Sequence, residues 1–202
     1  MIVKVCGLKE INNINQLNKI DIDLMGFIFY NKSSRFIKQE INISNLKKKK
    51  VGVFVNESLE NIKKKIKEYD LNYVQLHGDE TPKFSKKLMN YCKVIKVFRI
   101  SENFDFNITN QYTDCCDLFL FDTFSKKFGG SGKKFDWSKI KSFNNKKFLL
   151  SGGIDIDSID EIKGVKNENE FFLGIDINSK FEIYPGLKDI KKVNMFLKKL
   201  NK

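Results

Sequence analysis

The sequence contains no alanine, only two arginines, two prolines and a single histidine in 202 residues. No stretch longer than eight residues lacks a charged side chain, so we expect neither a membrane-spanning segment nor the apolar core of a secretory signal. One histidine excludes a His-rich metal site. The four cysteines include no C-x-x-C pair and predict free thiols in a reducing compartment. We therefore expect a soluble, cytoplasmic protein that binds no metal.

The formal net charge of +12 raises the question of an anionic partner such as nucleic acid. Thirty-five of the 37 cationic residues are lysine, however, and isoleucine, asparagine and phenylalanine are also abundant. All of these residues have A/T-rich codons, so the charge follows from a biased genome. Because nucleic-acid recognition favours the bidentate contacts of arginine, we expect no nucleic-acid partner.

Short apolar runs rich in β-branched and aromatic residues recur along the chain. Their length and composition predict strands, and their near-continuous apolar character is typical of parallel strands that are covered on both faces. The predicted strands are Ile2–Cys6, Leu24–Phe29, Val51–Val55, Tyr73–Leu76, Val94–Phe98, Leu118–Phe121, Phe148–Leu150 and Phe171–Ile175.

Lysine-rich segments of helical period lie between these runs. Helices are predicted from Ser58 to Tyr69, from Thr81 to Tyr91 and from Lys188 to Leu200, each with apolar residues on one stripe. Ser58 is a predicted N-cap, and Thr81 is one that a proline follows at the first helical position.

The spacing of the strands favours a barrel. Successive strands end 21 to 30 residues apart, and eight such strand–helix units fill the chain without a linker. We therefore predict an α/β fold in which residues 1–202 form one single-domain (β/α)8 TIM barrel. An open doubly wound sheet, which more often has five or six strands, is the alternative.

In such a barrel the chemistry lies at the carboxyl ends of the strands. Gly152 and Gly153 after the seventh strand, with Asn178 and Ser179 after the eighth, occupy the usual phosphate position, where glycines let backbone N–H groups approach phosphate oxygens. The loop 129–133 lacks both the third glycine of a dinucleotide motif and the flanking residues of a P-loop, and we interpret it as a lid with glycine hinges.

Cys6 ends the first strand and is followed by glycine, which gives access to its thiol. Most free cysteines are buried structural residues. Lys4, however, lies on the same face of the strand, so we expect its ammonium to lower the thiol pKa and to lie in the substrate site. Cys6 is therefore a candidate nucleophile or proton-abstracting base.

Asp122 ends the sixth strand, roughly across the barrel mouth from Cys6, as an acid and a base flanking one substrate would be placed. A strand-end cap is the alternative role for this aspartate. Arg35, one of only two arginines, is a candidate for bidentate binding of a carboxylate. For the lone His77 we expect a structural hydrogen bond and no catalytic role.

Motifs along the whole chain, in order, resemble those of the phosphoribosylanthranilate isomerase family. The motifs are Lys4–Leu8, Gly26–Tyr30 with Ser33–Arg35, Val51–Asn56, Val74–Glu80, Asp122–Thr123 with residues 129–133 and Phe135–Trp137, Ser151–Gly153, Gly174–Ser179 with Glu182, and Pro185–Asp189.

The resemblance implies a (β/α)8 barrel that converts the aminoaldose N-(5'-phosphoribosyl)anthranilate into an aminoketose by an Amadori rearrangement, in tryptophan biosynthesis. It implies that Asp122 is the general acid and Cys6 the general base. It places Arg35 at the anthranilate carboxylate and the last two strand-end loops at the phosphate. It implies a small phosphorylated substrate with no metal or organic cofactor, and we expect a monomer.

One departure concerns Lys180, which stands where the family has a glycine. If the backbone needs a positive φ there, we expect strain or a shifted loop; the alternative is that the Lys180 ammonium contacts the phosphate. Two rival functions remain. The sister barrel of histidine biosynthesis performs the same rearrangement with a pair of aspartates, and Cys6 argues against it. A decayed barrel that acts as a basic binding protein would make the net charge its function.

Overall fold

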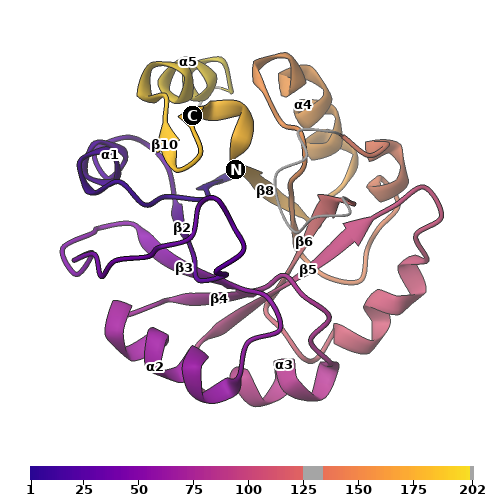
Figure 1. Cartoon of the computed structure of the whole chain (residues 1–202). Coiled ribbons are helices and arrows are strands. Elements are labelled where there is room, and N and C mark those ends of the chain that lie inside the picture. The colour runs from indigo at the N-terminus through magenta and orange to yellow at the C-terminus, as the bar shows by residue number, and fades with distance from the viewer. Residues whose placement is uncertain (125–133, 201–202) are drawn as a thin grey trace.

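The computed structural model describes residues 1–124 and 134–200, and in it eight parallel strands close into a barrel surrounded by helices (Figure 1). The strands pair in chain order, and β1 returns to pair with β8, so the barrel prediction is confirmed and the open sheet is excluded. The strands are β1 (Ile2–Val5), β2 (Leu24–Ile28), β3 (Lys49–Phe54), β4 (Tyr73–Leu76), β5 (Lys93–Ile100), β6 (Leu118–Thr123), β7 (Phe148–Leu150) and β8 (Phe172–Ile177).

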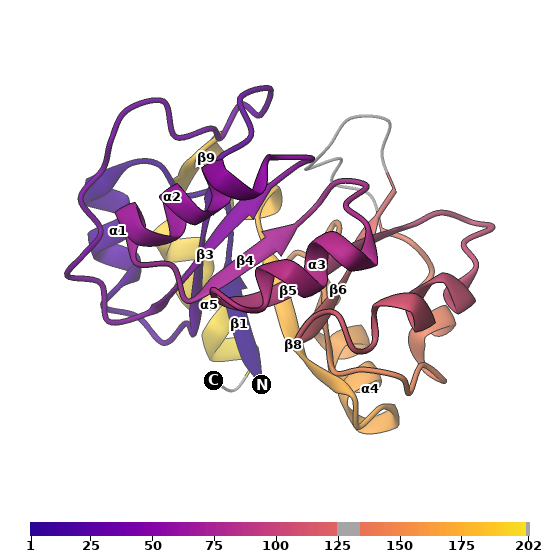
Figure 2. The same cartoon turned by 90° about the horizontal axis from the view of Figure 1, so that it is seen from below.

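Helices cover the outside of the strands, and Figure 2 shows α2 and α3 lying across β3 to β5. Ser58 and Thr81 cap α2 and α3 as predicted, each accepting a backbone N–H three residues on, from Asn61 and Phe84. The α-helices are α1 (Ile11–Leu17), α2 (Leu59–Tyr69), α3 (Pro82–Leu88), α4 (Ile159–Glu168) and α5 (Ile190–Leu200).

The prediction of an α-helix after every strand is wrong. In the described residues, β5 and β6 are followed by the 3-10 helices η1 (Phe106–Tyr112) and η2 (Trp137–Ile140), and β2 by an irregular segment. Asn, Asp, Ser and Thr are frequent there, and their side chains compete for the backbone hydrogen bonds of a helix. Two further 3-10 helices, η3 (Ile156–Ser158) and η4 (Ser179–Phe181), precede α4 and the hairpin β9 (Glu182–Tyr184)–β10 (Leu187–Lys188).

The barrel interior changes from apolar to polar along the strands. A small buried cluster fills its lower part and includes Tyr73, Leu120 and Leu149. Because strand side chains alternate between faces, the same inward face presents Gln75, Asp122 and Ser151 two residues further on. This apolar cluster therefore forms the bottom of a polar pocket. None of the described helices is long and apolar enough to cross a membrane.

Candidate active site

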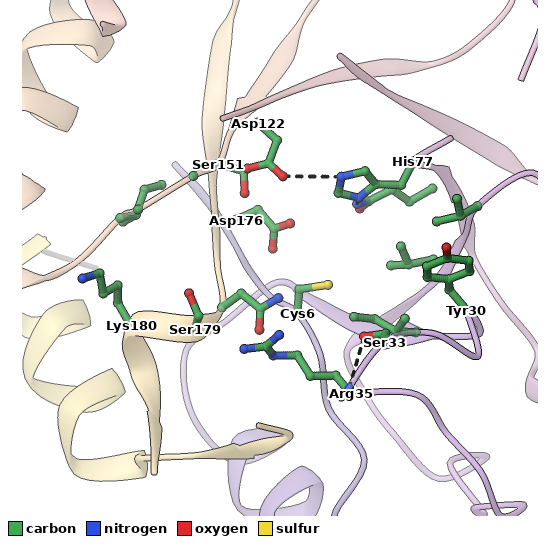
Figure 3. Close-up of a pocket in the computed structure, with 18 residues that line it drawn as sticks. Cys6, Tyr30, Ser33, Arg35, His77, Asp122, Ser151, Asp176, Ser179 and Lys180 are labelled. Atoms are coloured by element: carbon green, nitrogen blue, oxygen red, sulfur yellow. Dashed lines mark hydrogen bonds and ion pairs between the residues drawn. The ribbon is translucent and has the colours of Figure 1, made fainter. Parts of the chain in front are cut away.

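A pocket opens at the carboxyl ends of the strands, as expected for this fold (Figure 3). It contains all but one of the residues predicted for the site: Cys6, Arg35, Asp122, Gly152, Gly153, Asn178 and Ser179. The structure thus brings together side chains from both ends of the chain. The predicted lid at 129–133 lies outside the described residues.

The Cys6 thiol lies deep in the pocket wall, with only 4% of the residue exposed. Its backbone N–H donates to the Ile177 carbonyl at 3.0 Å, which ties β1 to β8 at the strand ends. Gly26 makes room for the sulfur, because a Cβ at that position would lie 2.6 Å from Sγ. Burial raises the pKa of the Cys6 thiol, and the Lys4 charge opposes this only in part. The expectation of a lowered pKa is therefore wrong, since desolvation outweighs the ammonium.

Lys4 is the predicted site residue that does not line the pocket. Its side chain is fully buried beneath the pocket, and Nζ donates to Asp176 Oδ2 at 2.7 Å. This position corrects the expectation that Lys4 touches the substrate: its ammonium neutralises a buried carboxylate and acts on Cys6 from below. Asp176, which sequence analysis did not single out, lies in the pocket, and its buried Oδ1 has no hydrogen-bond partner among residues 1–124 and 134–200.

The Arg35 guanidinium already binds a carboxylate within the protein. Nε and Nη2 donate to the two oxygens of Glu182 at 2.9 and 2.7 Å. Glu182 also accepts from Lys188 Nζ at 2.8 Å, and the same ammonium donates to Asn178 Oδ1 at 2.7 Å. Burial lowers the pKa of Lys188 to about 8 despite the attraction of Glu182. This network fixes Arg35 and the loop after β8 together at one end of the pocket.

Gly7 allows this network to form. Its φ is +79°, and a Cβ there would lie 2.6 Å from the Arg35 side chain and 2.7 Å from Asn178 Oδ1. Both a left-handed backbone and the close approach of two side chains therefore require glycine at this position.

The loop after β7 carries Gly152 and Gly153, both with positive φ, and a Cβ on Gly152 would collide with Thr123. Lys180 lies in η4, and its backbone is not among the positive-φ positions of the described residues. The condition on which strain was expected at Lys180 is therefore not met.

Asp122 and His77 face one another across the upper part of the pocket (Figure 3). Asp122 Oδ1 accepts from the Thr123 backbone at 2.9 Å, and Oδ2 lies 3.4 Å from His77 Nε2. In the described residues no group of histidine, cysteine and carboxylate side chains could hold a metal ion.

Comparisons with known proteins agree with this geometry. A model of the family described as N-(5'-phosphoribosyl)anthranilate isomerase matches residues 3–199. The curated N-(5'-phosphoribosyl)anthranilate isomerase of Parabacteroides distasonis is 42% identical, over 99% of this chain and 93% of that protein. That of Phocaeicola vulgatus is also 42% identical, over 99% of this chain and 98% of that protein.

Solved structures extend the similarity to three dimensions. The phosphoribosyl anthranilate isomerase of Thermotoga maritima superposes with a TM-score of 0.84 at 31% identity, covering 100% of this chain and 99% of that one. A phosphoribosyl anthranilate isomerase in complex with reduced 1-(o-carboxyphenylamino)-1-deoxyribulose 5-phosphate gives 0.81 at 28% identity over the same shares of the two chains. With sequence, fold and pocket in agreement, the chain belongs to the N-(5'-phosphoribosyl)anthranilate isomerase family.

Proposed function

We propose that this chain converts N-(5'-phosphoribosyl)anthranilate into 1-(2-carboxyphenylamino)-1-deoxyribulose 5-phosphate in tryptophan biosynthesis, with Asp122 as general acid and Cys6 as general base. The observation that carries the proposal is that a carboxyl and a thiol line one pocket from β6 and β1. An aldose–ketose rearrangement needs an acid and a base on one substrate, and no redox group.

Asp122 acts first. Its carboxyl protonates the ring oxygen, the C1'–O bond breaks with its electron pair going to that oxygen, and the anilino nitrogen lone pair forms the C1'=N bond of a protonated Schiff base. Asp122 ends this step as a carboxylate. Its Oδ1 is already held by the Thr123 N–H, which fixes the direction from which Oδ2 approaches the substrate.

Cys6 acts second. Its thiolate takes the C2' proton, the C–H electrons form the C1'=C2' bond, and the C1'=N electrons return to nitrogen to give a neutral enolamine. The enolamine tautomerises to the ketone. Because burial raises the pKa of the Cys6 thiol, the thiolate is the minor form at neutral pH.

Two ends of the pocket bind the two anionic ends of the substrate. Arg35 keeps Nη1 on the edge away from Glu182 and is proposed to bind the anthranilate carboxylate. Gly152, Gly153, Asn178 and Ser179 are proposed to bind the phosphate through backbone N–H groups and polar side chains.

The assignment of residues 1–202 to a single domain is supported by the pairing of β1 with β8. That the protein is monomeric and cytoplasmic stays a prediction.

The test is turnover of freshly generated phosphoribosylanthranilate, followed by loss of its fluorescence, with wild type, Cys6→Ala and Asp122→Asn. We expect activity in the wild type and loss of about 100-fold or more in each variant. A folded wild type without turnover would overturn the proposed function. Full activity of either variant would overturn the role of that residue.

A further inference from the structure

Three buried polar atoms that line the pocket lack a hydrogen-bond partner in the described part of the chain: Gln75 Oε1, His77 Nε2 and Asp176 Oδ1. Buried polar atoms are seldom left unpaired without a functional reason. Two of the three belong to Gln75 on β4 and His77 at its end, and His77 faces Asp122; these two residues carry the inference.

We propose that His77 is a positioning residue that orients the Asp122 carboxyl and stabilises the carboxylate formed when Asp122 gives its proton to the substrate. This rests on the function proposed above and goes beyond it, because sequence analysis gave the lone histidine a structural role only. The side chains of His77 and Asp122 are 12% and 13% exposed, and Nε2 lies 3.4 Å from Oδ2. The two atoms do not form a hydrogen bond within the described residues, and catalytic contacts that are long or poorly aligned commonly tighten once substrate is bound.

Gln75 lies beside the other ring nitrogen of His77. The Gln75 side-chain amide nitrogen lies 3.4 Å from His77 Nδ1. An amide nitrogen can only donate, so with Nδ1 accepting from it the proposal places the ring proton on Nε2. Nε2 is also the ring nitrogen 3.4 Å from Asp122 Oδ2, where it makes no hydrogen bond in the part of the chain that the structure describes. Gln75 itself is 1% exposed, which keeps water from competing for this arrangement.

The backbone that carries His77 is held on both sides. The His77 N–H donates to the Phe54 carbonyl at 2.9 Å, which extends the β3–β4 ladder to the strand end. The next residue, Gly78, donates to both oxygens of Glu80, and its carbonyl accepts from Lys96 Nζ at 2.8 Å.

The ion pair under this turn is itself buried. Glu80 and Lys96 lie 2.8 Å apart with side chains 3% and 4% exposed. A side chain on Gly78 would collide with Asn56, whose own backbone N–H donates to Glu80 at 2.9 Å. A histidine with only a packing role does not require a backbone held by so many contacts. A histidine that positions a catalytic carboxyl does require it.

The chemical consequence follows from the proton balance of ring opening. The Asp122 O–H bond breaks and a hydroxyl forms on the substrate, which leaves a negative charge on Asp122 in a largely buried site. The Nε2–H of His77 donates to that charge where water has little access, so the contact strengthens as the proton leaves Asp122. The interaction is stronger in the transition state than in the ground state and therefore acts on kcat.

A matched pair of variants tests the proposal. His77→Gln keeps an N–H donor at roughly the reach of Nε2, while His77→Met has similar size and no donor. We expect His77→Met to lower kcat about 10- to 100-fold with KM within about threefold, as for groups that orient a catalytic side chain. His77→Gln should recover most of that loss. Titration with reduced 1-(o-carboxyphenylamino)-1-deoxyribulose 5-phosphate should give unchanged affinity for both.

The outcomes separate this proposal from the function on which it rests. Wild-type kcat in His77→Met, or equal losses in both variants, would overturn the positioning role while leaving the function intact. A rise in KM with loss of analogue binding would show a structural role and also overturn it. An inactive wild type would overturn the function itself. If His77→Met does not fold, Gln75→Met gives a second test, because it removes the contact to His77 Nδ1. We expect this variant to lower kcat by a small amount. An unchanged kcat would contradict the proposal.

Discussion

The two sides of the pocket are built differently. On the side of β1, β8 and β10, each buried charge has a partner of opposite sign: Lys4 pairs with Asp176 at 2.7 Å, and Glu182 joins Arg35 and Lys188. On the side of β4 and β6, the polar groups Gln75, His77 and Asp122 approach one another only at 3.4 Å.

Because the proposed base Cys6 lies at the end of β1, the difference is not one between binding and proton transfer; it separates paired charges from polar groups that have no short contact. The β1–β8 side holds charges whose neutralisation is completed by the fold itself, so it is prepared before any substrate arrives. The β4–β6 side keeps hydrogen-bonding capacity that a substrate and a departing proton can use. Changes to the paired charges of the first side should therefore reduce stability, and changes to Gln75, His77 or Asp122 should reduce turnover with little effect on stability.

The largest effect is expected from Lys4→Met. It leaves Asp176, 5% exposed, as a buried carboxylate without its cation, and removing one partner of a buried ion pair commonly costs about 3–5 kcal/mol. Urea unfolding measures the loss, and the double variant with Asp176→Asn should regain part of it. The matched control is Lys65→Met in the surface pair with Glu68, where about 0.2–1 kcal/mol is expected. Equal losses for Lys4 and Lys65 would remove the contrast between the two sides of the pocket.

The next largest effect is expected in the rate at which Cys6 is alkylated at different pH values. Its thiol pKa lies above the ordinary value of 9.0 because of burial, so the thiol stays mostly protonated below that pH. Each unit of rising pH then increases the thiolate fraction about tenfold, and alkylation by iodoacetamide should accelerate about 100-fold from pH 7 to pH 9. Mass spectrometry of the Cys6 peptide follows the rate. A plateau below pH 8 would mean that Lys4 outweighs burial after all.

A smaller effect is expected from Glu182→Gln. The change keeps the shape of the side chain but leaves the Arg35 and Lys188 cations facing each other across a neutral amide. Charged hydrogen bonds of this kind contribute about 2 kcal/mol, and release of Arg35 should raise KM about tenfold. Urea unfolding and steady-state kinetics measure both quantities. Glu168→Gln, in an exposed pair with Lys141, is the control that should leave both unchanged.

The smallest effect is expected from Lys180→Gly. Since the backbone there has no positive φ, restoring the glycine relieves no strain and should change the unfolding free energy by less than about 1 kcal/mol. KM should rise no more than about threefold, through loss of one ammonium at the pocket edge. A stabilisation above 1 kcal/mol would indicate strain that the backbone angles do not show.

The strand ends were predictable because both faces of each strand are buried. The runs ending near Cys6, Leu76 and Asp122 are apolar at almost every position, and polar residues begin where the barrel opens. Even spacing then placed Cys6 and Asp122 at one mouth. After β5 the sequence analysis expected an α-helix, but the chain forms the 3-10 helix η1. Apolar spacing could not show this difference, because local side-chain hydrogen bonds such as the one that the Asn107 N–H donates to Asp105 decide which helix forms.

The partners of the site residues could not be predicted. Lys4 and Asp176 are 172 residues apart, and no periodicity within either strand indicates that they meet. His77 was underestimated for a related reason: alone in the sequence it has no partner, and only the closed barrel brings it to Asp122. Glu182 was noted as part of a motif, but its contact with Arg35 depends on the same closure.

The pairing of β1 with β8 also has a consequence for synthesis of the chain on the ribosome. Lys4 is made 172 residues before its partner Asp176, and Ile177, which accepts the Cys6 N–H, also belongs to the last strand of the barrel. A nascent chain that has not reached β8 carries an ammonium on β1 that no native carboxylate can neutralise. Closure of the barrel must therefore wait until β8 has been made, and β1 is the strand most in need of protection until then.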